Sequence, residues 1–110
     1  MGGRIVTDYL DEIQARADAA TDGPWEHVGS YGRIVSGPVQ VCRAYGDDGK
    51  ATPDAPFIAH ARTDIPRLVA ALRAVEALVA PYRSRADGWS PEAALARAVD
   101  TAIRDALDPT

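Results

Sequence analysis

The sequence predicts an α+β fold: an N-terminal helix, a small three-stranded antiparallel sheet, then a short helix and two longer C-terminal helices. Three observations predict it. Apolar residues recur at helical spacing over residues 10–20 and 65–82, short alternating runs broken by Gly and Pro fill residues 25–45, and 110 residues suit one ordinary domain. We expect an α+β core domain over residues 1–86. A C-terminal helical extension over residues 87–110 is expected to pack on this core or on a neighbouring protomer.

The first helix is expected over residues 8–20. Thr7 or Asp8 is suited to cap its N-terminus, where a short polar side chain accepts a hydrogen bond from a free backbone N–H. Gly23 and Pro24 follow its end. Gly is favoured just past a helix and Pro cannot continue one, so this pair predicts a sharp break.

Three strands are expected after the break. Residues 25–28 and 39–45 alternate apolar and polar side chains, residues 33–35 form a short strand between them, and residues 29–32 are typical of a hairpin turn. A sheet this small needs a helix on one face to be stable.

Trp25 directly follows the Gly-Pro break. We expect it to start the sheet and fold back over the apolar face of the first helix, with Phe57 and Ile58 packing in the same place. This would lock the angle between helix and sheet. The alternative is that Trp25 is exposed and faces a ligand.

A short helix is expected over residues 53–62, and a new helix is expected to begin at Ile65. Asp64 suits its N-cap, and Pro66 then falls in a first turn, where its missing N–H has no cost. Apolar residues from Ile65 to Tyr82 alternate spacings of three and four, which is a heptad seam. From this seam we expect an oligomer interface, a dimer or higher, formed by Leu68, Leu72, Val75, Val79 and Tyr82.

The last helix is expected over residues 91–107. Ser90 suits its N-cap, Pro91 its first position, and Trp89 the position of a hydrophobic staple. The residues expected on its apolar face are Leu95, Val99, Ala102, Ile103 and Ala106.

Net charge and cysteine content exclude several classes of function. A net charge of -4 argues against duplex nucleic acid as a partner, because binding phosphates needs concentrated Lys and Arg. Acidic residues gather in residues 8–22 and 87–108 and arginines in residues 62–85, so these blocks pair within or between chains or remain solvated. Cys42 is the only cysteine, and no leader or membrane-spanning run is recognisable, so we expect a cytoplasmic protein.

No motif in the sequence predicts catalysis or a metal site. His27, His60 and Cys42 lack the spacing of metal ligands, and Ser30 does not lie in a nucleophile elbow. We therefore expect a protein that is not an enzyme and has no cofactor.

One set of polar and aromatic residues predicts a binding site. Arg43 and Tyr45 share one face of a strand, His60 and Arg62 follow on the short helix, and Trp25 opens the sheet. Aromatic rings with arginines stack a base and clamp a phosphate. The alternative is that Arg43 and Arg62 pair with the acidic helices.

Two blocks of sequence resemble a protein family. ARADAATDGPWEHVG (residues 15–29) and DAPFIAHARTDIPRLVAALRAVEAL (residues 54–78) resemble small phage and prophage proteins of the Ead-like early-region type, and short proteins of actinobacterial phages. The resemblance covers residues 10–78. It implies a phage accessory protein, acting against host defence or on host metabolism by binding a host factor in the host cytoplasm. The alternatives are a sponge that sequesters a nucleotide-derived signal and a small hydrolase of such a signal.

Overall fold

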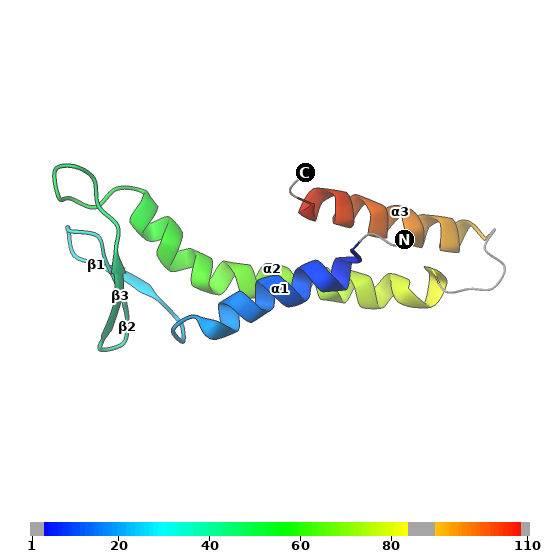
Figure 1. Cartoon of the computed structure of the whole chain (residues 1–110), viewed down its shortest axis with the longest axis horizontal. Coiled ribbons are helices and arrows are strands. Elements are labelled where there is room, and N and C mark those ends of the chain that lie inside the picture. The colour runs from blue at the N-terminus through cyan, green and yellow to red at the C-terminus, as the bar shows by residue number, and fades with distance from the viewer. Residues whose placement is uncertain (1–3, 84–89, 109–110) are drawn as a thin grey trace. The chain divides into compact units, whose positions relative to one another are not determined.

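The structure is a computed structural model that describes residues 4–83 and 90–108. Within these residues the elements are α1 (Val6–Ala19), β1 (Glu26–Val28), β2 (Arg33–Ser36), β3 (Val39–Arg43), α2 (Asp54–Arg83) and α3 (Pro91–Leu107) (Figure 1). This order confirms the predicted α+β class. The chain divides into two compact units, one formed by Ala15–Leu68 and the other by the described parts of Met1–Gln14 and Val69–Thr110. The domain boundary expected at residues 86–87 lies outside the described residues and stays a prediction.

The sheet is an antiparallel meander in the order β1-β2-β3, with a register irregularity between Ile34 and Val35. The turn between β1 and β2 contains Gly29 at φ +73° and Gly32 at φ +75°. Gly adopts this left-handed region at no steric cost, which explains why the chain reverses here. The hairpin predicted at residues 29–32 is therefore confirmed.

Strand β3 is shorter than the predicted run of residues 39–45. It ends at Arg43, and Tyr45 forms an isolated antiparallel bridge with Ala51 instead. Tyr45 is thus held beside the sheet by a single pairing rather than by a continuous strand.

The unit Ala15–Leu68 has its core between the sheet and the first half of α2. Ile34 and Ala55 are completely buried, and Ala59 is 4% exposed. Alanines at these positions let the helix backbone lie close to the sheet. The expected helix on one face of the sheet is therefore present, and it is supplied by α2. The partly buried residues around this core are Trp25, Val41, Cys42, Ala44, Ala51 and Ile58.

The expected partners of Trp25 are only half correct. Trp25 and Ile58 both pack against the Ile34 core, whereas Phe57 is 75% exposed. On a helix, positions 57 and 58 differ by about 100° in direction, so adjacent residues cannot share one buried face. Phe57 therefore turns to solvent because Ile58 takes the inward position.

Helix α2 runs without interruption over 30 residues, so the predicted break at residues 63–66 is wrong. Pro66 lacks the N–H that would reach the carbonyl of Arg62, a loss worth about 3 kcal/mol in a helix interior. Packed side chains lie on both sides of the proline, Ala59 before it and Val69 after it. Burial of both segments outweighs the local cost, and the helix continues. Over the described residues, none of the helices combines the length and apolarity needed to cross a membrane.

The second unit packs α1, the second half of α2 and α3 around its own core. Val6, Leu10 and Val69 are at most 3% exposed. The partly buried residues that cover them are Ile13, Leu72, Ile103 and Leu107. This core contains a residue from each of the three helical segments, so it holds α3 against α2.

The start of α3 is as predicted, but its buried face is not. Ser90 caps the helix, and its hydroxyl accepts a hydrogen bond from the Ala93 backbone N–H at 3.1 Å, with Pro91 in the first turn. The buried residues are Ala93 and Ala96, and Leu95 is 66% exposed. Ala102 and Ala106, also expected inside, are exposed, whereas Val99 and Ile103 are partly buried as expected. The staple expected from Trp89 lies outside the described residues.

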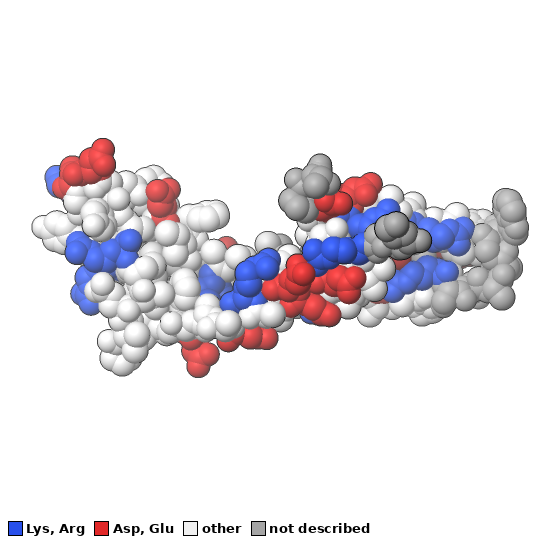
Figure 2. Space-filling view, in the orientation of Figure 1, with Lys and Arg blue, Asp and Glu red and all other residues white. Residues whose placement is uncertain are grey.

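Some of the expected pairing between acidic and basic segments is present within the chain. Arg73 of α2 binds Asp11 of α1 at 2.9 Å, and Arg83 binds Asp100 of α3 at 2.8 Å. Figure 2 shows acidic and basic side chains standing next to one another over α1. The Arg73–Asp11 pair is largely exposed and so contributes little stability.

Candidate functional site

The solvent-exposed side of the second half of α2 carries no charge. Between Ala70 and Tyr82 there are two charged residues, and neither belongs to the fully exposed set: the Glu76 side chain is 12% exposed, and the Arg73 side chain is 39% exposed and pairs with Asp11 of α1. We call the exposed set the outer face of α2. Its residues are Ala70, Ala71, Ala74, Val75, Ala77, Leu78, Pro81 and Tyr82.

Three large apolar side chains stand out on this outer face. Leu78 is 72% exposed, Tyr82 is 40% exposed and Val75 is 37% exposed. Their neighbours on this face are mostly alanines, so these three larger side chains protrude from it. A helix that is apolar on its exposed side as well as its buried side is normally covered on both.

The predicted heptad seam lies along the border between the buried and exposed sides of α2. Leu72 packs on the Val6, Leu10 and Val69 core, and Val79 is partly buried. Their apolar surface is therefore used within this chain. Leu68, Val75 and Tyr82 of the same seam are exposed. Leu78, which lies outside this seam, is the most exposed large apolar residue of the outer face.

Four of the five predicted ligand-binding residues form two separate pairs. Arg43 lies over the Tyr45 ring at 5.0 Å from its centroid and donates to the Tyr31 carbonyl at 3.4 Å. Tyr31 is 60% exposed and Tyr45 is 54% exposed, so both rings are open to solvent. Tyr31 was missed at the sequence level, because its position in a hairpin turn is explained by the turn alone.

The second pair shares one backbone carbonyl. The Trp25 indole N–H and the Arg62 Nε–H both donate to the Thr21 oxygen, each at 3.0 Å. Arg62 therefore helps to hold the segment that follows α1, and both side chains are partly buried. His60 is exposed on α2.

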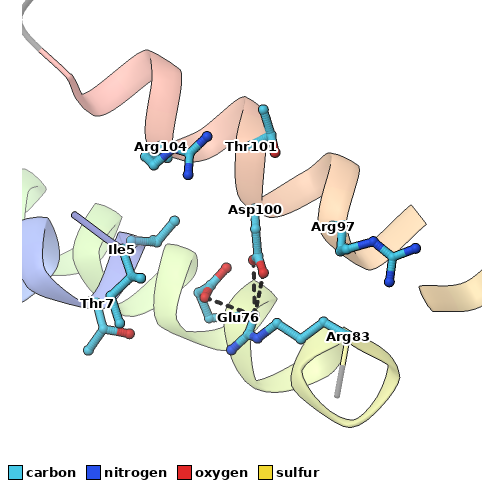
Figure 3. A pocket seen from close by; sticks show the side chains of 9 residues that line it. Ile5, Thr7, Glu76, Arg83, Arg97, Asp100, Thr101 and Arg104 are labelled. Carbon is cyan, nitrogen blue, oxygen red and sulfur yellow. Dashed lines mark hydrogen bonds and ion pairs between the residues drawn. The ribbon is translucent and has the colours of Figure 1, made fainter. Parts of the chain in front are cut away.

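A pocket of about 350 Å³ lies in the helical unit. Its lining residues are Ile5, Val6, Thr7, Glu76, Arg83, Arg97, Asp100, Thr101 and Arg104. Figure 3 shows Glu76 and Asp100 pointing toward Arg83, with Arg97 and Arg104 on α3 to either side of Asp100. The lining thus combines three guanidinium groups with two carboxyl groups and an apolar wall.

Arg83 joins the two carboxyl groups. Its Nη1 lies 3.2 Å from Glu76 Oε2 and at 3.0 and 2.8 Å from the two oxygens of Asp100. Only 12% of the Glu76 side chain is exposed. Burial raises the pKa of Glu76 above its usual value, and a hydrogen bond and charge repulsion from Asp100 add to the rise, while Arg83 opposes it.

No family model, curated protein or solved structure matches this chain.

The resemblance to phage proteins therefore stays a prediction, and so does each function that it implies. In the described part of the chain, no three His, Cys, Asp or Glu side chains gather as metal ligands would.

The sequence alone does not predict the charged pocket. Glu76 and Asp100 lie on different helices, and each looks like an ordinary surface carboxylate in its own segment. The one available signal was the block of arginines over residues 62–85 opposite an acidic C-terminal segment, which predicted pairing but named no partners.

Proposed function

We propose that this protein works as a binding protein that attaches to a protein partner through the outer face of α2. The observation that carries the proposal is the absence of charge from the exposed side of the described helix between Ala70 and Tyr82. Soluble proteins seldom leave a contiguous apolar patch of this kind open to water unless a partner covers it.

The charged residues of this helix support the proposal because they pair with other charged residues of the same unit. Arg73 contacts Asp11, and Glu76 and Arg83 contact Asp100 or one another. A helix whose outer side only met solvent would gain solubility from charges there. Here the charged residues pair inside the unit, and the side turned to water holds Ala, Val, Leu and Tyr.

The kind of partner follows from the shape of the face. The small alanine side chains around Leu78 and Val75 allow a second helix to approach closely, and the larger side chains can then fill the grooves of that helix. Burying each large apolar side chain contributes about 1.5–3 kcal/mol. A second copy of the chain is the simplest partner, because a two-fold axis pairs a face with itself and no like charges meet here.

Self-association is the direct test. Leu78→Glu should abolish oligomers, since a charge in a desolvated interface is costly, whereas Ala98→Glu on the exposed side of α3 should not. Light scattering across a concentration series gives the mass, and circular dichroism confirms that both variants stay folded. A wild type that stays monomeric at every concentration would contradict the second copy as the partner.

A different protein as partner needs its own test. A photo-crosslinking residue at Leu78 should give one reproducible product in host cells, and Ala74→Glu should remove it. The same residue at Ala98 is the matched control. Equal crosslinking from both positions would show that the outer face is not a specific interface. The host factor, the phage context and the cytoplasmic location are proposals that rest on the resemblance and on the single cysteine.

The stack of Arg43 on Tyr45 supports a second candidate function, the capture of a nucleotide-like ligand. An exposed ring beside a guanidinium offers a surface for a base and donors for a phosphate. Mononucleotides and cyclic dinucleotides should then quench tyrosine fluorescence, and Arg43→Gln should weaken this, while Arg33→Gln, whose Nε donates to Gln40, should not. Ligand recovered intact after denaturation fits a sponge, and cleaved ligand would mean an enzyme instead.

A further inference from the structure

We propose that the pocket of the helical unit binds a small organic anion, a carboxylate or a phosphate monoester, with Arg104 as its principal contact. The pocket is lined by the start of α1, the second half of α2 and one side of α3 (Figure 3). This site is distinct from the outer face of α2 and does not depend on the proposed function.

The charges of the lining favour an anion. The lining holds three arginines, Arg83, Arg97 and Arg104, and two carboxyl groups, so guanidiniums outnumber acids. Arg83 is engaged by both oxygens of Asp100 and acts as a structural link between α2 and α3. Arg104 is different, because its ion pair with Asp105 is long, at 3.9 Å. A guanidinium has five N–H donors in a planar fork, so Arg104 has donors for a bidentate contact with a carboxylate or phosphate.

Burial disfavours the charged form of the second carboxyl group of the pocket. Only 12% of the Glu76 side chain is exposed, and this burial, with Asp100 beside it, raises the pKa of Glu76 above its usual value. Glu76 Oε1 is buried and is the oxygen of that group that does not contact Arg83. A carboxyl group that resists ionisation opposes a bound anion less than an exposed carboxylate would.

The groups that line the pocket around Glu76 come from three helical segments, and those that affect its pKa are Asp100 and Arg83. Arg83 on α2 and Asp100 on α3 contact it, and Arg97 and Arg104 on α3 line the same pocket. From the start of α1 and the residue before it, the pocket is lined by Ile5, Val6 and Thr7, which are uncharged. Loss of the Glu76 proton therefore adds a negative charge beside the bound anion and weakens its binding.

The uncharged part of the lining indicates the size and kind of ligand. Ile5 and Val6 offer an apolar wall, and the hydroxyls of Thr7 and Thr101 offer donors. The positive end of the α1 dipole lies at the same place, since the helix begins at Val6. A volume of about 350 Å³ is at the lower end for ligand pockets, which suits one ring or a short chain bearing one anionic group.

Calorimetric titration with benzoate, phenyl phosphate and inorganic phosphate tests the site. We expect saturable binding, stronger for the ring-bearing anions than for inorganic phosphate, and a preference between benzoate and phenyl phosphate that identifies the anionic group. Arg104→Gln should weaken binding by about tenfold or more, as expected for loss of a charge-assisted contact. Arg16→Gln, which removes an exposed arginine of α1 outside the pocket, should leave it unchanged.

Removing the charge of Glu76 without changing the size of its side chain tests the role of this second carboxyl group. Glu76→Gln is neutral at every pH and removes a negative charge from the lining, so we expect it to bind benzoate at least as tightly as wild type does. Leu78→Glu should bind benzoate as wild type does, whatever happens to its association. Absence of saturable binding to all three anions, or equal binding by Arg104→Gln, would overturn the proposal, and weaker benzoate binding by Glu76→Gln would contradict the role given to the Glu76 carboxyl group.

Discussion

Replacing Trp25 tests whether its ring is part of the core or serves a ligand. The ring packs on the Ile34 core, and its indole N–H donates to the Thr21 carbonyl at 3.0 Å. Emptying a buried Trp site costs about 3–5 kcal/mol, and Trp25 is only partly buried, so the lower end applies. We expect Trp25→Ala to lower the free energy of unfolding by about 3 kcal/mol, a large part of the 5–15 kcal/mol typical of a domain.

Two further variants divide this loss into its parts. Trp25→Phe keeps most of the packing and removes the N–H, so it should cost about 1 kcal/mol for the lost hydrogen bond. Phe57→Ala removes a ring that is 75% exposed and should change stability by no more than about 0.5 kcal/mol. Arg62 also donates to Thr21, so that carbonyl keeps one partner in the Trp25→Phe variant.

Urea unfolding followed by far-UV circular dichroism measures all three variants against wild type. The order of loss should be Trp25→Ala, then Trp25→Phe, then Phe57→Ala. If Trp25→Ala were as stable as Phe57→Ala, the ring would not support the core. A variant that kept full stability but lost nucleotide binding would instead favour the ligand-facing alternative.

The remaining predictions concern the turn at Gly32 and the carboxyl group of Glu76. Gly32→Ala should cost about 3 kcal/mol or more in the same urea assay, because a Cβ there would lie 1.9 Å from the Ala44 carbonyl oxygen. Gly29→Ala has a similar φ and open space around it, so it should cost only about 1–2 kcal/mol, and equal losses would contradict the clash. Glu76 has a raised pKa in the folded state, so its contribution is fully present below its unfolded-state pKa and is lost as pH rises through the folded value. Wild type should therefore lose stability relative to Glu76→Gln across that window, and parallel stability–pH curves for the two proteins would contradict a raised pKa of Glu76 in the folded state.

Local signals were enough to predict most of the elements. Ser90 followed by Pro91 marks a helix start whatever surrounds it, because the cap satisfies backbone donors within one turn. The positive φ of Gly29 and Gly32 likewise depends on the lack of a side chain at those positions. Cap and turn chemistry operate over a few residues, so a single sequence reveals them.

Long-range packing decided where those local signals failed. Pro66 is a strong signal for a helix start, yet α2 continues through it because side chains on both sides of the proline are buried. The heptad spacing of α2 predicted an apolar stripe but not its direction. Because apolar residues occur on most sides of the helix, only contact with Val6 and Leu10 determines that Val69 faces inward and Leu78 outward.

By itself, then, the sequence determined the α+β class, the hairpin, the cap of α3 and the apolar character of α2, since each depends on neighbours within a few positions. Only the tertiary structure decided which side of α2 remains open and which charges meet. Arg83 and Asp100 are 17 residues apart in sequence. The pKa of Glu76 is raised only in the folded chain, where the side chain is mostly buried and lies beside this pair. A pKa shift, a pocket and an exposed apolar face are properties of neighbours in space, and folding alone brings those neighbours together.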